Sequence, residues 1–243
     1  MKELQGIFFD LDDTLYSCTK FAESARRNAC KALVEAGVDY PEEDLYAELV
    51  SVIDEFSSNY DYHFDKVLLR IPQSSIEGLN RTVLIAAAVV AYHNTKVREL
   101  FPYEDALDLL QRLQKTDLVR GLISAGKPFK QAEKLVRLGL LKYLSHGAIF
   151  ITEQVGITKA NPRLFLLACE RVKIEPEKTM YIGDNPLWDI DVPNDLGMIT
   201  VHHKRQGKHA QKESRTQPDY VINNFYDLMD ILQTEFDLPI FER

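Results

Sequence analysis

Short apolar runs recur along the chain, and most of them end in polar residues. The first, residues 7–9, is unbroken and leads directly into acids, which is typical of a parallel strand buried on both faces. Similar runs predict five further strands, at residues 118–123, 147–152, 179–183, 199–202 and 220–222. The pattern therefore predicts a sheet of short buried strands.

The segments between these strands have apolar residues at helical spacing. They predict helices at residues 105–115, 129–138, 162–172, 190–196 and 225–233. Strands that alternate with helices in this way form βαβ units. We therefore expect an α/β protein whose core is a three-layer, Rossmann-like parallel sheet.

The interval after the first strand is too long for a simple crossover. A crossover needs a dozen or so residues, whereas this interval offers about eighty. Its apolar residues, such as Phe21, Ala25 and Ala29, follow helical spacing. We expect an inserted helical domain at residues 16–98 and a core domain made of residues 1–15 and 99–243.

Composition and charge exclude several classes of protein. The 243 residues are 45% hydrophobic and 27% charged, the balance of an ordinary globular protein rather than a disordered or fibrous one. The net charge of −8 argues against a nucleic-acid partner. The most apolar stretch, residues 83–92, is shorter than the ~20 residues that span a bilayer. We expect a cytoplasmic protein, a monomer or homodimer, with no membrane partner.

The polar segment 203–217 is rich in Lys, Arg, Gln and Ser, and it predicts a mobile surface loop. The chain has three cysteines, Cys18, Cys30 and Cys169, with no CxxC pair. An odd number at wide spacing favours reduced thiols over disulfides. The sequence assigns no role to Cys18.

Polar residues gather where the predicted strands end. Asp10 and Asp12 follow the first strand, Ser124 follows the second, and Asp184 follows the fourth. Lys159 lies in the segment after the third strand. Because the carboxyl ends of parallel strands meet at one edge of a sheet, these side chains are candidates for a common site.

The residue types at this edge suit phosphate and metal chemistry. Asp10 and Asp12 project to the same side if the chain stays extended, so they form either a divalent-cation site or a nucleophile with an acid/base partner. Asp184 adds a further oxygen ligand of the kind that Mg²⁺ prefers. Ser124, the free N–H groups of a turn at Gly126, and Lys159 suit a phosphoryl group.

Four segments in order resemble the motifs of the haloacid dehalogenase (HAD) superfamily of phosphohydrolases. They are FFDLDDTL, LISAG, KANPRLF and GDNPLWDI. The resemblance covers nearly the whole chain, including a helical cap inserted after the first motif. It implies a Mg²⁺-dependent phosphatase that acts on a small phosphorylated metabolite.

The resemblance also implies roles for individual residues. Asp10 would attack phosphorus and become an aspartyl phosphate, and Asp12 would protonate the leaving alcohol and then activate water. Mg²⁺ would be held by Asp10, the backbone carbonyl of Asp12, and Asp184. Ser124, the backbone amide of Ala125 and Lys159 would hold the phosphoryl oxygens. Asp189 would orient Lys159 or a metal-bound water.

Two residues depart from the pattern of many relatives. Ala125 replaces an Asn, which removes a side-chain donor but keeps the backbone amide. Ala160 replaces the Pro that often follows the lysine, which loosens the turn. Neither change affects the expected reaction.

Substrate specificity is expected from the cap. The candidates lie just after the first motif or in the link between two predicted cap helices: Tyr16, Lys20, Asn59, Tyr60 and His63. The cap is similar to those of archaeal-type glyceraldehyde 3-phosphate phosphatases, which implies a substrate of three-carbon or sugar size. Trp188 either packs its loop or stacks on a substrate ring.

Other functions on the same scaffold stay open. A phosphomutase would return the phosphoryl group to a second hydroxyl, and a binding protein would hold a phosphorylated ligand without turnover. A haloacid dehalogenase also uses an aspartate nucleophile, but a halide needs no proton, so Asp12 argues against it. A signalling receiver domain would be about half as long and would lack the insert.

Overall fold

Parallel strands form the central sheet of the protein. In the structure, a computed structural model that describes residues 2–205 and 207–240, the order along the sheet is β3-β2-β1-β4-β5-β6. Every neighbouring pair is parallel. The strands are β1 (Gly6–Phe9), β2 (Val119–Ser124), β3 (Ile149–Ile151), β4 (Thr179–Gly183), β5 (Ile199–His203) and β6 (Tyr220–Ile222). The expected parallel α/β core is confirmed.

Strand β1 is buried on both faces, as its unbroken apolar run predicts. The Phe8 ring packs edge-on against Phe150 with centroids 6.0 Å apart, and the Phe9 ring packs against Phe225 at 6.2 Å. On neighbouring β2, a Cβ at Gly121 would lie 2.0 Å from the Phe8 ring. Glycine at position 121 therefore makes room for Phe8, its partner in the pairing of β1 with β2.

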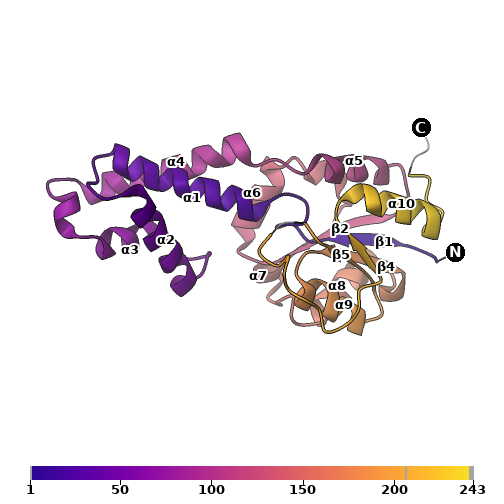
Figure 1. Cartoon of the computed structure of the whole chain (residues 1–243). Helices are drawn as coiled ribbons and strands as arrows, with labels where there is room; N and C mark the ends of the chain where they lie inside the picture. The colour runs from indigo at the N-terminus through magenta and orange to yellow at the C-terminus, as the bar shows by residue number, and fades with distance from the viewer. Residues whose placement is uncertain (1, 206, 241–243) are drawn as a thin grey trace. The chain divides into compact units, whose positions relative to one another are not determined.

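Helices cover both sides of this sheet (Figure 1). On one side lie α5 (Glu104–Leu113) and α10 (Phe225–Phe236), and on the other lie α8 (Arg163–Val172) and α9 (Asp191–Asp195). The remaining helical segments of this part are α6 (Pro128–Arg137), η2 (Leu141–Tyr143), α7 (Thr152–Val155), η3 (Pro176–Lys178) and η4 (Pro186–Ile190). No helix in the described ranges has the length and hydropathy needed to cross a membrane.

The predicted helix at 190–196 is wrong in its boundaries. The chain forms a π-helical turn, η4, and then the short α9. Pro193 lacks an N–H and is tolerated because it lies in the first turn of α9, where amides have no partner within the helix. Wide turns of this kind occur often at functional sites, and η4 carries Asp189.

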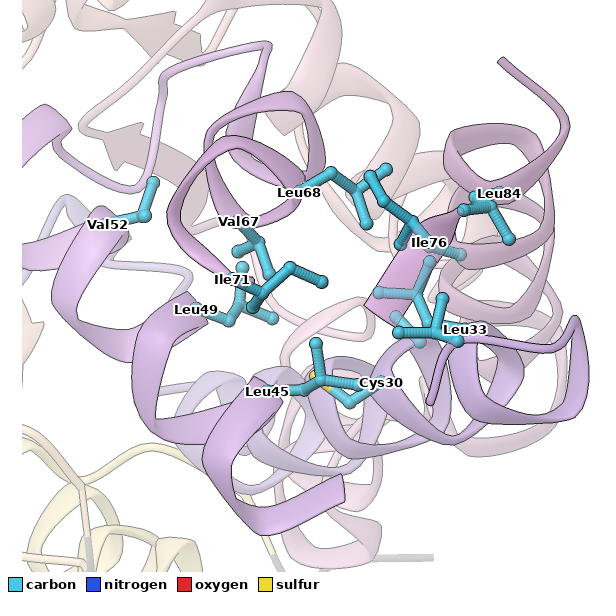
Figure 2. Packing of buried hydrophobic residues seen from close by; sticks show 13 residues of the cluster. Cys30, Leu33, Leu45, Leu49, Val52, Val67, Leu68, Ile71, Ile76 and Leu84 are labelled. Carbon is cyan, nitrogen blue, oxygen red and sulfur yellow. The ribbon is translucent and has the colours of Figure 1, made fainter. Parts of the chain in front are cut away.

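The chain divides into two compact units, one made of residues up to Cys18 and from Phe101 onward, the other of Thr19–Leu100. The second unit is helical. Its elements are α1 (Cys18–Glu35, which starts one residue earlier), α2 (Glu42–Phe56), α3 (His63–Arg70), η1 (Gln73–Ile76) and α4 (Arg81–Glu99). Leu33, Leu45, Leu49 and Val67 converge in its core (Figure 2). The inserted unit therefore has a hydrophobic core of its own.

The predicted loop at residues 203–217 is wrong at its first residue, which belongs to a strand. His203 belongs to β5, is buried, and stacks on Phe225 with centroids 4.8 Å apart. The described residues after it, 204–205 and 207–217, lie outside helices and strands. They are attached to the core where Arg205 pairs with Asp105 and where the Thr216 amide donates to the Asp191 carboxylate at 2.7 Å.

Candidate active site

A buried lysine joins two acids at the carboxyl edge of the sheet. The Lys159 ammonium donates to the Asp10 carboxylate, and it also donates to Asp189 Oδ1 at 2.9 Å. Lys159 is 3% exposed, Asp10 6% and Asp189 1%. Three residues that are far apart in the sequence, all predicted site residues, are thus in direct contact.

Asp10 is placed by the end of β1. Its amide donates to the Ile182 carbonyl at 2.8 Å, which continues the pairing with β4 by one residue. Asp13, with φ of +58°, then turns the chain away from the strand direction. The Thr14 hydroxyl comes back to donate to Asp10 Oδ2 at 3.2 Å. One oxygen of Asp10 thus faces Lys159 and the other faces Thr14.

Asp189 is held by the start of η4. Its amide donates to the Asn185 carbonyl at 2.8 Å, and its Oδ2 accepts from the Asn185 amide at 3.0 Å. A Cβ at Gly183, the last residue of β4, would lie 2.3 Å from the same Oδ2. A larger residue at position 183 would therefore displace the Asp189 carboxylate.

The acids at this edge form a group suited to a cation. Carboxylate oxygens of Asp10, Asp184 and Asp189 lie within 4.8 Å of one another. Asp184 Oδ2 is buried and has no hydrogen-bond partner among the described residues. Three carboxylates against the one ammonium of Lys159 leave a formal charge of −2. An all-oxygen donor set with this charge fits Mg²⁺.

The acid group contains both side chains that were expected to hold the metal, Asp10 and Asp184. Asp189 belongs to it, whereas the Asp12 side chain, which follows the same strand as Asp10, does not. The Asp12 carboxylate instead contacts residues of another element. The expected backbone carbonyl of Asp12 as a ligand stays a prediction.

Burial and mutual repulsion favour protons on two of these acids. Burial raises the pKa of Asp184 to about 9, and the nearby Asp10 and Asp189 carboxylates add to the effect. Burial also raises the pKa of Asp10 to about 7, although the Lys159 ammonium opposes this rise. At Lys159, burial would lower the pKa of the ammonium, but the negative charges of Asp10 and Asp189 outweigh burial and raise it.

These raised pKa values predict a pH-dependent response to Mg²⁺. The folded, metal-free protein binds protons at Asp10 and Asp184 that the unfolded chain has already lost, so its free energy of unfolding falls as pH rises between about 4 and about 9. Mg²⁺ replaces these protons and binds better as they leave. We expect Mg²⁺ to raise Tm more at about pH 8 than at about pH 5.

Melting curves recorded with Mg²⁺ and with EDTA measure this effect. Asp184→Asn is the control, because it removes the acid with the higher pKa and should weaken both the response to Mg²⁺ and its pH dependence. An equal Mg²⁺ shift at both pH values would contradict the assignment of the cation to these acids.

The Asp12 carboxylate is surrounded by donors. Lys134 Nζ lies 2.7 and 2.8 Å from its two oxygens, and Gln131 Nε2 lies 3.0 Å from Oδ2. The Tyr16 hydroxyl donates to Oδ1. Burial alone would raise the pKa of Asp12, but the Lys134 charge and these hydrogen bonds hold it below its usual value. Tyr16, predicted as a specificity residue, is buried and in contact with the acid itself.

Strand β2 brings a hydroxyl to the same edge. Ser124 is 1% exposed, and its Oγ accepts from Gln131 Nε2 at 2.7 Å. The Ala125 carbonyl accepts from the same amide nitrogen at 2.6 Å. The prediction that the backbone N–H of Gly126 is free is wrong, because this N–H donates to Thr152 Oγ1 at 3.0 Å.

The other candidate specificity residues, Lys20, Asn59, Tyr60 and His63, lie in the helical unit. The Tyr60 ring stacks on the Phe56 ring with centroids 4.8 Å apart, and the His63 ring lies edge-on to Tyr60 with centroids 5.7 Å apart. His63 Nε2 is within 2.9 Å of the Ser57 carbonyl. Phe56, Tyr60 and His63 thus form a local aromatic group where α2 ends and α3 begins, whereas Lys20 lies in α1.

Trp188 lies in the sheet-containing unit, as does Cys18, to which the sequence assigns no role. Trp188 is 42% exposed on η4. Burial raises the pKa of the Cys18 thiol to about 12, so the thiolate is disfavoured.

Sequence reasoning missed Gln131 and Lys134. Gln131 shares the buried face of α6 with Leu135, one turn further on, so it is a polar residue at a core position. A buried amide costs free energy unless it is hydrogen-bonded. This break in the apolar pattern was the available signal that α6 contributes to the site.

Fold and site define the class: a parallel α/β enzyme whose centre combines buried carboxylates with a lysine. The family described as "Hydrolase: haloacid dehalogenase-like hydrolase" matches residues 4–197. The chain belongs to this family, which confirms the resemblance of its four motifs.

Curated relatives match nearly the full length. The chain is 40% identical over 235 residues to a glyceraldehyde 3-phosphate phosphatase of Methanopyrus kandleri, covering 95% of this chain and 97% of that protein. It is 36% identical over 237 residues to the protein of the same name from Pyrococcus furiosus, covering 97% and 95%. A solved HAD phosphatase from Thermococcus onnurineus has a TM-score of 0.65 at 22% identity, over 94% of this chain and 98% of that one, and supports the fold.

Proposed function

We propose that this chain is a Mg²⁺-dependent phosphatase that hydrolyses a small phosphate monoester, with glyceraldehyde 3-phosphate as the substrate. The observation that carries the proposal is the Lys159 ammonium, which contacts Asp10 and Asp189 beside the unpartnered Asp184 oxygen. Phosphoryl transfer depends mainly on positioning and charge neutralisation, and this arrangement supplies both.

Asp10 is the nucleophile of the proposed reaction. One of its oxygens attacks phosphorus, the bond to the leaving alcohol breaks, and an aspartyl phosphate forms. Asp12 must carry a proton when the ester binds; it gives this proton to the leaving oxygen and, as the carboxylate, later takes one from the water whose oxygen attacks phosphorus as the bond to Asp10 breaks. Ser124, the Ala125 amide and Lys159 hold the phosphoryl oxygens, and Asp189 fixes Lys159 through its contact at 2.9 Å.

Asp10, Asp184 and the backbone carbonyl of Asp12 would hold the metal ion. Mg²⁺ bound there would neutralise charge on the phosphoryl oxygens. Its binding would also relieve the repulsion that raises the pKa values of Asp10 and Asp184.

The choice of substrate is assigned to the inserted helical unit, which we propose as a cap comprising residues 16–98. The support is indirect, because the relatives named glyceraldehyde 3-phosphate phosphatase align over this unit as well as the core. Lys20, Asn59, Tyr60 and His63 are its proposed contacts. A small sugar phosphate shares the required phosphate and hydroxyl groups, so it belongs in the test.

Phosphate release from a panel of esters tests the proposal. The panel includes glyceraldehyde 3-phosphate, sugar phosphates, phosphoglycolate and nucleotides, each with Mg²⁺ and with EDTA. We expect Mg²⁺-dependent release with the highest kcat/KM for glyceraldehyde 3-phosphate. Asp10→Asn protein, purified in the same way, controls for contaminating phosphatases.

Phosphorus NMR of the products separates hydrolysis from its rivals. Inorganic phosphate as the product supports hydrolysis, whereas a phosphoryl group moved to another hydroxyl would indicate a mutase. Binding of esters without turnover would instead indicate a phospho-ligand binding protein.

A further inference from the structure

Helix α6 presents two donors, one turn apart, to the same carboxylate. Residues three apart on a helix are neighbours on its surface, as Gln131 and Lys134 are. Lys134 bonds both oxygens of Asp12, and Gln131 bonds Oδ2. With the Tyr16 hydroxyl on Oδ1, each oxygen receives two donors.

The contact of Lys134 is directed at Asp12. Its side chain is 21% exposed and that of Asp12 is 31% exposed, so the pair lies at the margin of the site rather than on open surface. A charge-assisted contact to both carboxylate oxygens fixes the rotation of the carboxylate as well as its place. A general acid/base must lie within hydrogen-bond reach of the proton it transfers, so its orientation affects turnover.

Gln131 has partners beyond Asp12. Its amide nitrogen lies 3.0 Å from Asp12 Oδ2, 2.7 Å from Ser124 Oγ and 2.6 Å from the Ala125 carbonyl, so its two protons are shared among three acceptors. A serine hydroxyl has one proton and two acceptor positions, so Ser124 can accept from Gln131 and still donate to a phosphoryl oxygen. Gln131 is 3% exposed; the bonds of its amide nitrogen offset part of the cost of burial, whereas its Oε1 has no hydrogen-bond partner among the described residues.

We propose that Lys134 and Gln131 are positioning residues for the phosphatase reaction. Lys134 orients the Asp12 carboxylate, and Gln131 couples that carboxylate to the phosphate-binding Ser124. The proposal rests on the proposed function. It predicts different kinetic signatures for the two residues, because Lys134 contacts the acid/base Asp12, whereas Gln131 contacts the phosphate-binding Ser124 as well.

Kinetics of variants on α6 test this assignment. Lys134→Met is expected to lower kcat about 100-fold, the size of effect that a misplaced catalytic group produces, with KM and inhibition by inorganic phosphate unchanged. Lys134→Arg should restore most of the lost kcat, since it keeps a cation on a side chain of similar length. Gln131→Leu should lower kcat and weaken inhibition by phosphate as well.

Arg137→Met is the matched control. Arg137 lies on the same helix and pairs with Glu133 at 2.9 Å. Its removal takes away the same charge and is expected to leave kcat unchanged. Melting temperatures of all variants show whether a change in kcat accompanies a loss of stability.

Several outcomes would overturn the inference. If the wild type is active and Lys134→Met has the same kcat, the positioning role of Lys134 is wrong, while the proposed function still stands. A kcat loss that follows a lower Tm and is not rescued by Lys134→Arg would show that the pair only stabilises the fold. A wild type that hydrolyses no ester would overturn the proposed function, and this inference with it.

Discussion

Asp10→Asn is expected to reduce phosphate release by at least about 10⁴-fold, because loss of a covalent nucleophile leaves only binding and charge stabilisation to act on the ester. The substitution keeps the size of the side chain and removes one of the grouped carboxylates around Lys159. Repulsion among these acids contributes to their raised pKa values, so the variant should fold at least as stably as the wild type without metal. Phosphate release and Tm are measured on the same preparation.

Rapid acid quenching with labelled ester identifies the step that is lost. The wild type and an Asp12→Asn variant should both form a labelled, acid-stable phosphoenzyme, and the Asp12→Asn variant should hydrolyse it more slowly. Asp10→Asn should form none. Wild-type turnover by Asp10→Asn would mean that another group attacks phosphorus.

The residues that end the strands were predictable, because a strong local pattern placed them. Asp10, Ser124 and Asp184 each follow an apolar run directly, and the parallel sheet brings the ends of β1, β2 and β4 side by side. Lys159 does not follow a strand directly; its place at this edge was predicted from the segment after the third strand, and the resemblance to the family added its role. Its contacts with Asp10 and Asp189 confirm only that the residues meet.

Contacts that depend on the orientation of a helix were not predictable. The contact of α6 with Asp12 needs the rotation of the helix about its axis and the length of the Lys134 side chain. The Gly126 amide looked free in the sequence, but it donates to Thr152, which follows a different strand. Hydrogen bonds between separate loops at the sheet edge leave no periodic trace in the sequence.

Charge balance connects the stability of the site with its activity. The buried acids outnumber the buried lysine, so the metal-free protein keeps protons on Asp184 and Asp10 at pH values where such acids are normally charged. A cation removes the need for these protons. The group of buried acids and Lys159 that would accept a phosphoryl group therefore also makes the stability of the folded state depend on metal. Substitutions in this group should change both Tm and kcat.

Lys159→Met is expected to destabilise the metal-free protein and to weaken phosphate binding. Removing one partner of a buried ion pair costs about 3–5 kcal/mol, which corresponds to a fall in Tm of roughly 10 °C for a chain of this size. The side chain keeps its length but leaves Asp10 and Asp189 without their shared cation. Inhibition by phosphate or vanadate should weaken, since the ammonium no longer attracts the anion.

The double variant Lys159→Met with Asp189→Asn separates these two effects. It restores the formal charge of the buried group to that of the wild type, so Tm in EDTA should recover in part. Binding of phosphate and vanadate should stay weak, because the cation that contacts the phosphoryl oxygens is still absent. If the double variant regained inhibition as well as Tm, Lys159 would serve only to balance the acids, and its proposed contact with the phosphoryl group would be wrong.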